Sequence, residues 1–382
     1  MIDVQKTRDW LIDGAPGAAT SPEVLKKTGD QLSACGVRLD RAEAFVRTLH
    51  PNVAGRSFAW MPGQSVVVEE RSYGWLSSPA FAGTPMAGTC ETGEYRRARI
   101  SADNLPHLAA DGYTDLFATP LRFLHGQTHV LTFITRHPDG FRDDDLEAIR
   151  SVVPPMARVA EILALMRTAT NLLDTYVGHN AGGRILRGQI RLGDTTTVRA
   201  LIWFSDLRGF TVLSQSVPPV EVIRALNDLF ACQIPSIEKR GGEVLKFIGD
   251  GLLAIFPIDD AAAPGKRAND AVDAAKESLA ALVKMNASRG AIGSAPLSFG
   301  LALHLGDVAY GNIGGANRLD FTCIGEAVNV AARLEALTAK LSRPVVLSEV
   351  VAKLVTAPTE DLGSFELKGV AAPHKAFGLV GV

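Results

Sequence analysis

The sequence predicts an α/β protein of two domains joined by a helical connector. Its 382 residues are more than one hydrophobic core usually supports. Short stretches with the alternation typical of strands occur in both halves, and stretches with helical periodicity lie between them. We therefore expect a mixed α/β domain at residues 1–150, a connector at 151–197 and a second domain at 198–382.

The composition indicates neither a nucleic-acid-binding nor a membrane protein. The chain has 39 Lys and Arg against 41 Asp and Glu, a net charge of −2, so a phosphate-rich ligand would be held by local charges. No uncharged run approaches the ~20 residues that span a bilayer, and "MIDVQKTRDW" lacks the apolar segment of a signal peptide. The four cysteines are far apart without a CxxC pair. We expect a cytoplasmic protein with no membrane span and no nucleic-acid partner.

The first domain contains ordinary helix and strand signals. Ser21 as N-cap and Gly36 as terminator predict one helix, and "RLDRAEAFVRTLH" at 38–50 predicts a second. Strands are expected near 57–62 and 64–70, a loop at 77–94, two strands around Gly126, and a helix over 141–153. The last of these stretches, from 118 to 153, resemble the C-terminal half of a GAF domain. The resemblance implies a small-molecule regulator, whose identity the sequence does not give.

The connector carries apolar residues at alternating steps of three and four. This spacing predicts a parallel helix pair that joins two subunits, although a surface helix packed on its own domain has the same pattern. Pro154 and Pro155 predict a helix boundary or kink near its start. The residues of this predicted seam are Val152, Pro155, Val159, Ile162, Met166, Ala169, Leu173 and Tyr176.

Two aspartates of the second domain stand at the ends of apolar stretches. "VRALIWFSD" predicts a strand on which Asp206 shares a face with Ile202 and Phe204. "EVLKFIGDGLLAIF" predicts a hairpin with Asp250 at its tip. Asp250 alone is also explained by the turn, and Asp206 by capping of the next helix. Together they favour a site for Mg²⁺ or Mn²⁺, which take one or two carboxylates plus substrate phosphates.

A third cluster follows near residue 320. The segment 296–314 predicts two strands, 314–325 a glycine-bearing loop, and "EAVNVAARLEALTAK" a helix with an apolar stripe. Asn329 and Arg333 are spaced i, i+4 on another face of this helix, where they could bind a sugar and a phosphoryl group together. An ordinary solvated polar face is the alternative. His304 is interpreted as a core residue of a strand, and the basic run at 95–99 as a solvated surface.

Four motifs in order, "FSDLRGFT", "EVLKFIGDG", "FTCIGEAVNVAARLE" and "FELKGV", resemble the class III nucleotidyl cyclase catalytic domain over residues 198–380. The resemblance implies an α+β fold of the ferredoxin-like βααββαβ type. It also implies that Asp206 and Asp250 bind two divalent metal ions, Mg²⁺ or Mn²⁺, in each active site.

The same resemblance assigns roles to five further residues. It implies that Lys246 and Thr322 bind the base, Asn329 orients the ribose, Arg333 stabilises the transition state and Lys368 binds the terminal phosphates. A lysine donates but does not accept, which suits adenine N1 and not guanine N1, so the expected substrate is ATP. Family members place the metal aspartates and the remaining site residues on different subunits, which implies a homodimer.

The resemblance leaves other functions open. A guanylate or pyrimidine nucleotide cyclase would keep the aspartates and change the base pocket. A catalytically silent nucleotide-binding module would lack an aspartate or Arg333, and all are present. A diguanylate cyclase is disfavoured because its GGDEF signature is missing. Thr322 also motivates the hypothesis of bicarbonate sensitivity, which a bicarbonate titration at fixed pH would test.

Overall fold

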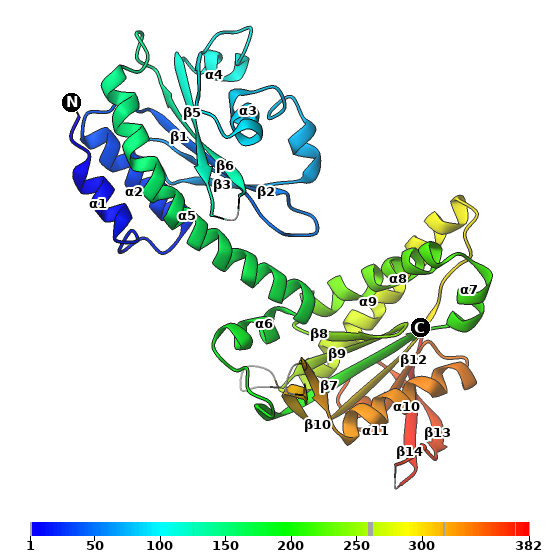
Figure 1. Ribbon diagram of the computed structural model, residues 1–382. Helices are drawn as coiled ribbons and strands as arrows, with labels where there is room; N and C mark the ends of the chain where they lie inside the picture. The colour runs from blue at the N-terminus through cyan, green and yellow to red at the C-terminus, as the bar shows by residue number, and fades with distance from the viewer. Residues whose placement is uncertain (1, 125, 259–262, 316–317, 371, 382) are drawn as a thin grey trace. The chain divides into compact units, whose positions relative to one another are not determined.

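The chain folds into two compact units, residues 1–172 and residues 173–382, each with its own β-sheet (Figure 1). The computed structural model describes residues 2–124, 126–258, 263–315, 318–370 and 372–381. None of the helices in this described part combines the length and the apolar composition needed to cross a membrane.

Unit 1 is a six-stranded antiparallel sheet in the order β3-β2-β1-β6-β5-β4. Helices α1, α2 and α5 cover one face, and α3 and α4 lie on the other (Figure 1). The strands are β1 (Arg41–Arg47), β2 (Gly55–Trp60), β3 (Val67–Arg71), β4 (Arg96–Arg99), β5 (Asp115–Arg122) and β6 (Thr128–Thr135). The helices are α1 (Gln5–Ile12), α2 (Ser21–Ala34), η1 (Tyr73–Ser77), α3 (Pro85–Thr92), α4 (Pro106–Ala110) and the longer α5.

Three local predictions for unit 1 are wrong. Residues 41–47 form strand β1, because its position between β2 and β6 places Ala44 in one core and Phe45 in the other. The N-cap of α2 is Thr20, whose side chain accepts a hydrogen bond from the Glu23 backbone in a capping box. The expected loop at 77–94 contains the helix α3.

Helix α5 (Asp143–Val177) continues from unit 1 into unit 2. Pro154 and Pro155 lie inside it, so they do not mark a helix boundary, and the alternative, a kink, stays a prediction. Val152 and Val159 are buried in the core of unit 1, as expected for a helix packed on its own domain. Farther along, Ile162, Met166 and Tyr176 are 59%, 64% and 81% exposed, so pairing of two chains through this part stays a prediction.

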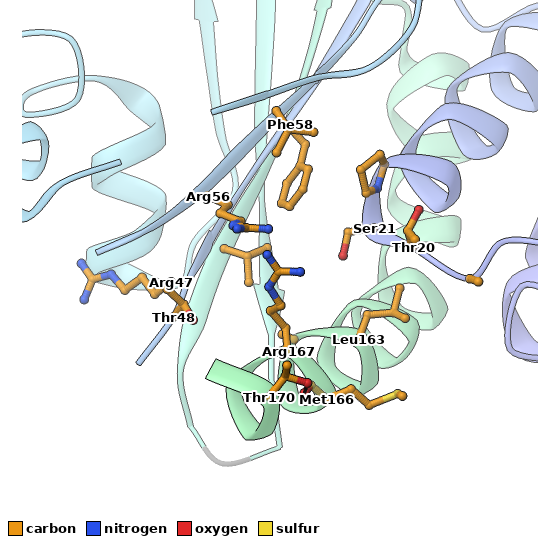
Figure 2. Close-up of a pocket in the computed structure, with 15 residues that line it drawn as sticks. Thr20, Ser21, Arg47, Thr48, Arg56, Phe58, Leu163, Met166, Arg167 and Thr170 are labelled. Atoms are coloured by element: carbon orange, nitrogen blue, oxygen red, sulfur yellow. Dashed lines mark hydrogen bonds between the residues drawn. The ribbon is translucent and has the colours of Figure 1, made fainter. Parts of the chain in front are cut away.

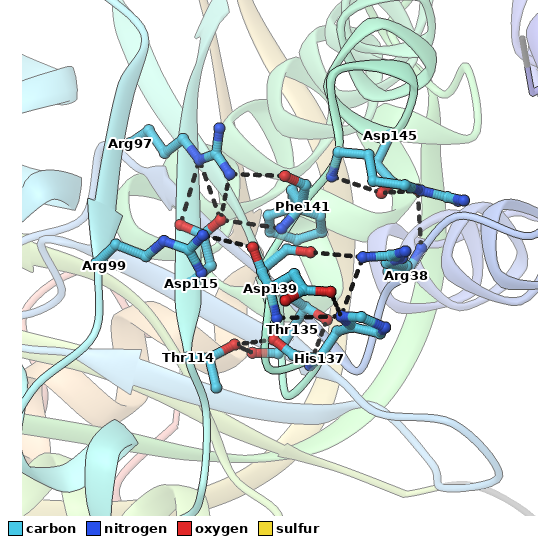
Figure 3. Close-up of polar contacts among 12 residues, drawn as sticks. Arg38, Arg97, Arg99, Thr114, Asp115, Thr135, His137, Asp139, Phe141 and Asp145 are labelled. Atoms are coloured by element: carbon cyan, nitrogen blue, oxygen red, sulfur yellow. Dashed lines mark hydrogen bonds and ion pairs between the residues drawn. The ribbon is translucent and has the colours of Figure 1, made fainter.

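Buried carboxylates anchor the start of α5 and the neighbouring strand ends (Figure 3). Asp145 accepts hydrogen bonds from the backbone N–H groups of Arg142 (2.8 Å) and Arg38 (3.2 Å). Asp115 is fully buried and forms an ion pair with Arg97 at 2.7 Å. The basic run at 95–99 is therefore more than a solvated surface, since Arg97 neutralises a buried charge.

Unit 2 has an eight-stranded sheet in the order β13-β14-β12-β10-β7-β9-β8, with β11 paired to β10. Helices α8 and α9 cover one face and α10 the other (Figure 1). The strands are β7 (Thr195–Leu207), β8 (Glu243–Ile248), β9 (Gly251–Pro257), β10 (Phe299–Gly315), β11 (Arg318–Ile324), β12 (Val345–Ser348), β13 (Thr359–Phe365) and β14 (His374–Leu379). The helices are α6 (His179–Leu186), α7 (Phe210–Ser216), α8 (Pro219–Lys239), α9 (Pro264–Ala291), α10 (Glu326–Lys340) and α11 (Glu349–Ala352).

The third cluster differs most from its prediction. Instead of two strands, residues 299–315 form one long strand, β10, whose residues 299–311 pair with β7. Most of the expected loop is strand β11, and residues 316–317 of that loop lie outside the described residues. His304 is buried in the sheet, where burial and the nearby His374 lower its pKa to about 4, as expected for a core residue.

Candidate active site

The ends of β7 and β9 bring Asp206 and Asp250 together. Asp206 lies opposite Gly251 in the β7–β9 ladder, so it is one residue from Asp250 at the hairpin tip. Burial raises the pKa of Asp206 to about 7, and the carboxylates of Asp250 and Glu335 act in the same direction. Helix α7 has Gly209 as N-cap and no side-chain cap, so Asp206 is not a capping residue.

Glu335 and Arg208 complete this group, and sequence reasoning missed both. Glu335 is a buried residue of α10, burial raises its pKa, and its closest cation, Arg208, is 3.9 Å away. Gly300 lies opposite Asp206 on β10, where an added Cβ would be 2.2 Å from Arg208 Nη2 and 2.4 Å from Glu335 Oε1. The absence of a side chain at Gly300 therefore lets these groups approach the strand. Motif spacing gave no signal for this contact.

Lys246 lies farther along β8, and a β-bulge sets its direction. The ladder shifts register between Val244 and Lys246, so Lys246 lies opposite Leu253 and Val244 opposite Ala254. Val244 and Lys246 therefore point to opposite faces of the sheet, because paired residues of an antiparallel ladder point the same way. The ammonium of Lys246 forms an ion pair with Asp320 of β11, an acceptor that sequence reasoning also missed.

Thr322 lies two residues beyond Asp320 on β11. Its side chain is buried, and its hydroxyl has no hydrogen-bond partner in the described part of the chain. Phe321 and Cys323 beside it belong to a hydrophobic cluster with Tyr310. A buried hydroxyl without a partner carries a desolvation cost of about 1–3 kcal/mol. A ligand that supplies a donor or an acceptor here would remove that cost.

Helix α10 presents two predicted site residues outward. Its apolar stripe is buried as expected, whereas Asn329 and Arg333 are exposed. Within the described residues, neither side chain has a hydrogen bond or ion pair, and the same holds for Lys368, exposed in the turn between β13 and β14. The structure thus gathers the acidic residues but does not bring these three side chains into contact with them.

The acidic group fits a divalent cation by its chemistry. Asp206 and Asp250 are oxygen donors whose mutual repulsion a cation would relieve, and Mg²⁺ or Mn²⁺ prefer such ligands. In the described chain, no three His, Cys, Asp or Glu side chains are grouped so that they could hold a metal ion. Two carboxylates with substrate phosphates are a usual ligand set for magnesium.

Comparison with known proteins identifies the unit that carries this group. Residues 195–380 match the family model of the adenylate and guanylate cyclase catalytic domain. These residues form a class III cyclase domain. An adenylate cyclase of Anabaena cylindrica is 37% identical to the chain over 193 residues, 50% of this chain and 36% of that protein. A terminal-differentiation-specific adenylate cyclase of Dictyostelium discoideum is 34% identical over 160 residues, 42% of this chain and 7% of that protein.

The match covers the cyclase domain and not the relatives' full length. The chain spans about a third of the Anabaena cylindrica relative and less than a tenth of the other. Among solved structures, the adenylyl cyclase CyaB from P. aeruginosa is 26% identical, with a TM-score of 0.45 over 49% of this chain and 96% of that chain. The guanylyl cyclase Cya2 is 29% identical, with a TM-score of 0.44 over 49% of this chain and 94% of that chain.

Proposed function

We propose that this chain is an adenylate cyclase that converts ATP to 3′,5′-cyclic AMP and pyrophosphate, with regulation by unit 1. The observation that carries the proposal is the pair formed by Asp206 and Asp250 at the ends of β7 and β9, in a domain of the cyclase family. The two carboxylates would hold two Mg²⁺ or Mn²⁺ ions per site. Such ions, when bound, lower the pKa of the ribose 3′-hydroxyl and offset the charge of the triphosphate.

The base would be read by Lys246 and Thr322. One of the three N–H donors of Lys246 is used by Asp320, which leaves donors for adenine N1. The hydroxyl of Thr322 is buried without a partner, so it is free to bind the adenine amino group. Guanine carries a hydrogen at N1 and does not accept a bond there, so the pair favours ATP over GTP.

The reacting groups would be oriented by residues of α10. Asn329 would hold the ribose so that its 3′-oxygen faces the α-phosphorus. Arg333 would donate to the phosphoryl oxygens as the bond to pyrophosphate breaks, since its planar guanidinium offers several donors in a fixed geometry. Lys368 would bind the terminal phosphates. Asn329 and Arg333 are exposed on the single chain, which supports a homodimer in which they complete the partner's site.

The test is incubation of the purified chain with ATP, GTP, CTP or UTP in the presence of Mg²⁺ or Mn²⁺, with products identified by mass. We expect cyclic AMP from ATP and less than about a tenth of that turnover from the others, as expected for a mismatched polar contact. A product formed mainly from another nucleotide would contradict the substrate assignment. No product under any condition would support the silent-module alternative.

A further inference from the structure

Unit 1 contains a half-open cavity of about 440 Å³ that the proposed chemistry does not use. It lies between the start of α2, the strands β1, β2 and β3, and the last turns of α5 that belong to unit 1 (Figure 2). A cavity of this size suits a small organic ligand.

The cavity is cationic on one side. Of the fifteen described residues that line it, three are arginines and none is acidic. Figure 2 shows the guanidinium groups of Arg56 (β2) and Arg167 (α5) directed toward one another, whereas Arg47 points away. Arg56 forms an ion pair with Glu70, outside the lining. Arg167 has no hydrogen-bond or ion-pair partner in the described part of the chain.

The other side of the cavity is apolar. Phe58 projects into it from β2, and Leu163 of α5 lies near it (Figure 2). Behind these residues is a smaller void of about 20 Å³, lined by Phe58, Leu163 and further core side chains such as Leu121 and Met156. The cavity therefore offers an apolar wall and a short apolar extension opposite its two converging arginines.

The start of α2 is not what binds an anion here. Glu23 accepts hydrogen bonds from the backbone N–H groups of Ala19 (2.8 Å) and Thr20 (3.2 Å), and Thr20 caps the Glu23 N–H. The helix thus satisfies these N–H donors with its own carboxylate. Arg56 and Arg167 are left as the groups that attract negative charge.

We propose that this cavity binds a small organic anion, a carboxylate or a phosphate ester, with its charge between Arg56 and Arg167 and its apolar body against Phe58 and Leu163. Arginine binds both anions with paired, charge-assisted hydrogen bonds. The ligand would join β2 to α5, the helix that continues to Val177 in the cyclase unit. Any effect on turnover rests on the proposed function, but the binding itself does not.

The test uses the full chain and two fluorescent probes that differ in one group, 8-anilinonaphthalene-1-sulfonate and its neutral parent N-phenyl-1-naphthylamine. We expect the sulfonate to bind at one saturable site per chain. Arg56→Gln and Arg167→Gln should each weaken it about tenfold, as expected for loss of one charge-assisted bond. Arg47→Gln is the matched control, since its guanidinium points away, and should change the affinity by less than about twofold.

The neutral probe separates anion recognition from apolar binding, because its affinity should be the same in the wild type and in both arginine variants. Competition with 1-naphthoate and 1-naphthyl phosphate then distinguishes a carboxylate from a phosphate ester. Thermal melting of each variant shows that it is folded, and Arg167→Lys, which keeps the charge, should bind the sulfonate better than Arg167→Gln.

Three results would overturn the proposal. They are unchanged sulfonate binding in Arg56→Gln and Arg167→Gln, equal weakening of both probes, and displacement by neither competitor. No readout uses turnover, so failure here is distinct from failure of the cyclase assignment.

Discussion

Two groups of polar side chains in unit 2 differ in whether they meet within one chain. Asp206, Asp250 and Glu335 lie together; burial raises the pKa of Asp206 to about 7, and the charges of Asp250 and Glu335 act in the same direction. Asn329 and Arg333, only a few residues from Glu335 on the same helix, face outward without a partner in the described chain. The opposite faces of α10 thus serve different purposes.

Under the proposed function, this difference separates the residues that one chain brings together from those that a partner chain would complete. The acidic half is assembled within one chain: Asp206 lies on β7, which pairs with β9 and β10, Asp250 lies in the turn before β9, and Glu335 lies on α10. The side chains of Asn329 and Arg333, by contrast, have no hydrogen-bond or ion-pair partner within the described residues. If the two halves of the site come from different copies of the chain, a substitution in either half should abolish activity. A mixed dimer that combines one intact half from each copy should restore it.

The largest expected effect comes from mixing two inactive chains. Asp206→Ala and Arg333→Ala should each reduce kcat by about 10³-fold or more, since both remove charge stabilisation of the transition state. In a mixed dimer, the first chain supplies Arg333 and the second supplies Asp206, so one of the two sites is intact. Purified mixed dimers, isolated with two different affinity tags, should therefore recover about half of the wild-type turnover.

The control is a mixed dimer of Asp206→Ala with Asp250→Ala. Both substitutions lie in the acidic half, so neither site is restored and activity should stay at the background of the single variants. Recovery in this control, or none in the Asp206→Ala and Arg333→Ala dimer, would contradict the division of the site between chains.

The strands that carry Asp206 and flank Asp250 were predicted from the sequence because their signals are local. The hairpin around Asp250 and the alternation before Asp206 are short-range patterns, and both strands form as expected. Glu335 and Arg208 were missed because they come together only when α10 packs over Gly300. This contact joins segments that are at least 35 residues apart in the sequence. Asp320 was missed because the surrounding segment was predicted to be a loop, and its pairing with Lys246 requires β11 and a bulge in β8.

Unit 1 shows a different limit of prediction from the sequence. Its residues 41–47 have a helical pattern and form a central strand, because pairing with β2 and β6 outweighs local preference. No motif indicated the cavity near Arg56 and Arg167, since these residues are more than 100 positions apart in the sequence. Here the fold, and not a recognisable pattern, defines the candidate ligand site.

A smaller effect is expected at Thr322, whose hydroxyl is buried and, like Arg333, has no hydrogen-bond partner in the described residues. Thr322→Val replaces the hydroxyl by a methyl group of similar size. If the hydroxyl binds the base, KM for ATP should rise about tenfold, the value of one hydrogen bond of roughly 1.4 kcal/mol. The melting temperature should stay the same or rise, because an unsatisfied polar group is removed from the core.

Thr338→Val provides the matched control for stability. Thr338 is equally buried, but its hydroxyl donates to the Glu335 carbonyl oxygen at 2.5 Å. This variant should lose about 1 kcal/mol of unfolding free energy, as measured by chemical denaturation. A Thr322→Val chain that is destabilised to the same extent, with KM unchanged, would show that the Thr322 hydroxyl has a structural role instead.

The smallest expected effect is a change in how stability depends on pH. The folded pKa of Asp206 is about 7, above its ordinary value of 3.8, so the folded chain holds a proton that the unfolded chain releases. Without metal, this group's contribution to stability should therefore fall as the pH rises from about 4 to 7. A divalent cation binds the ionised pair and competes with that proton, so Mn²⁺ should raise the melting temperature by about 3 °C more at pH 8 than at pH 6.

In Asp206→Asn the carboxyl no longer titrates, and melting curves should lose both the extra Mn²⁺ effect and the decline between pH 4 and 7 that Asp206 causes. An Mn²⁺ effect that is independent of pH in the wild type, or that persists in Asp206→Asn, would place the cation away from the acidic half of the site.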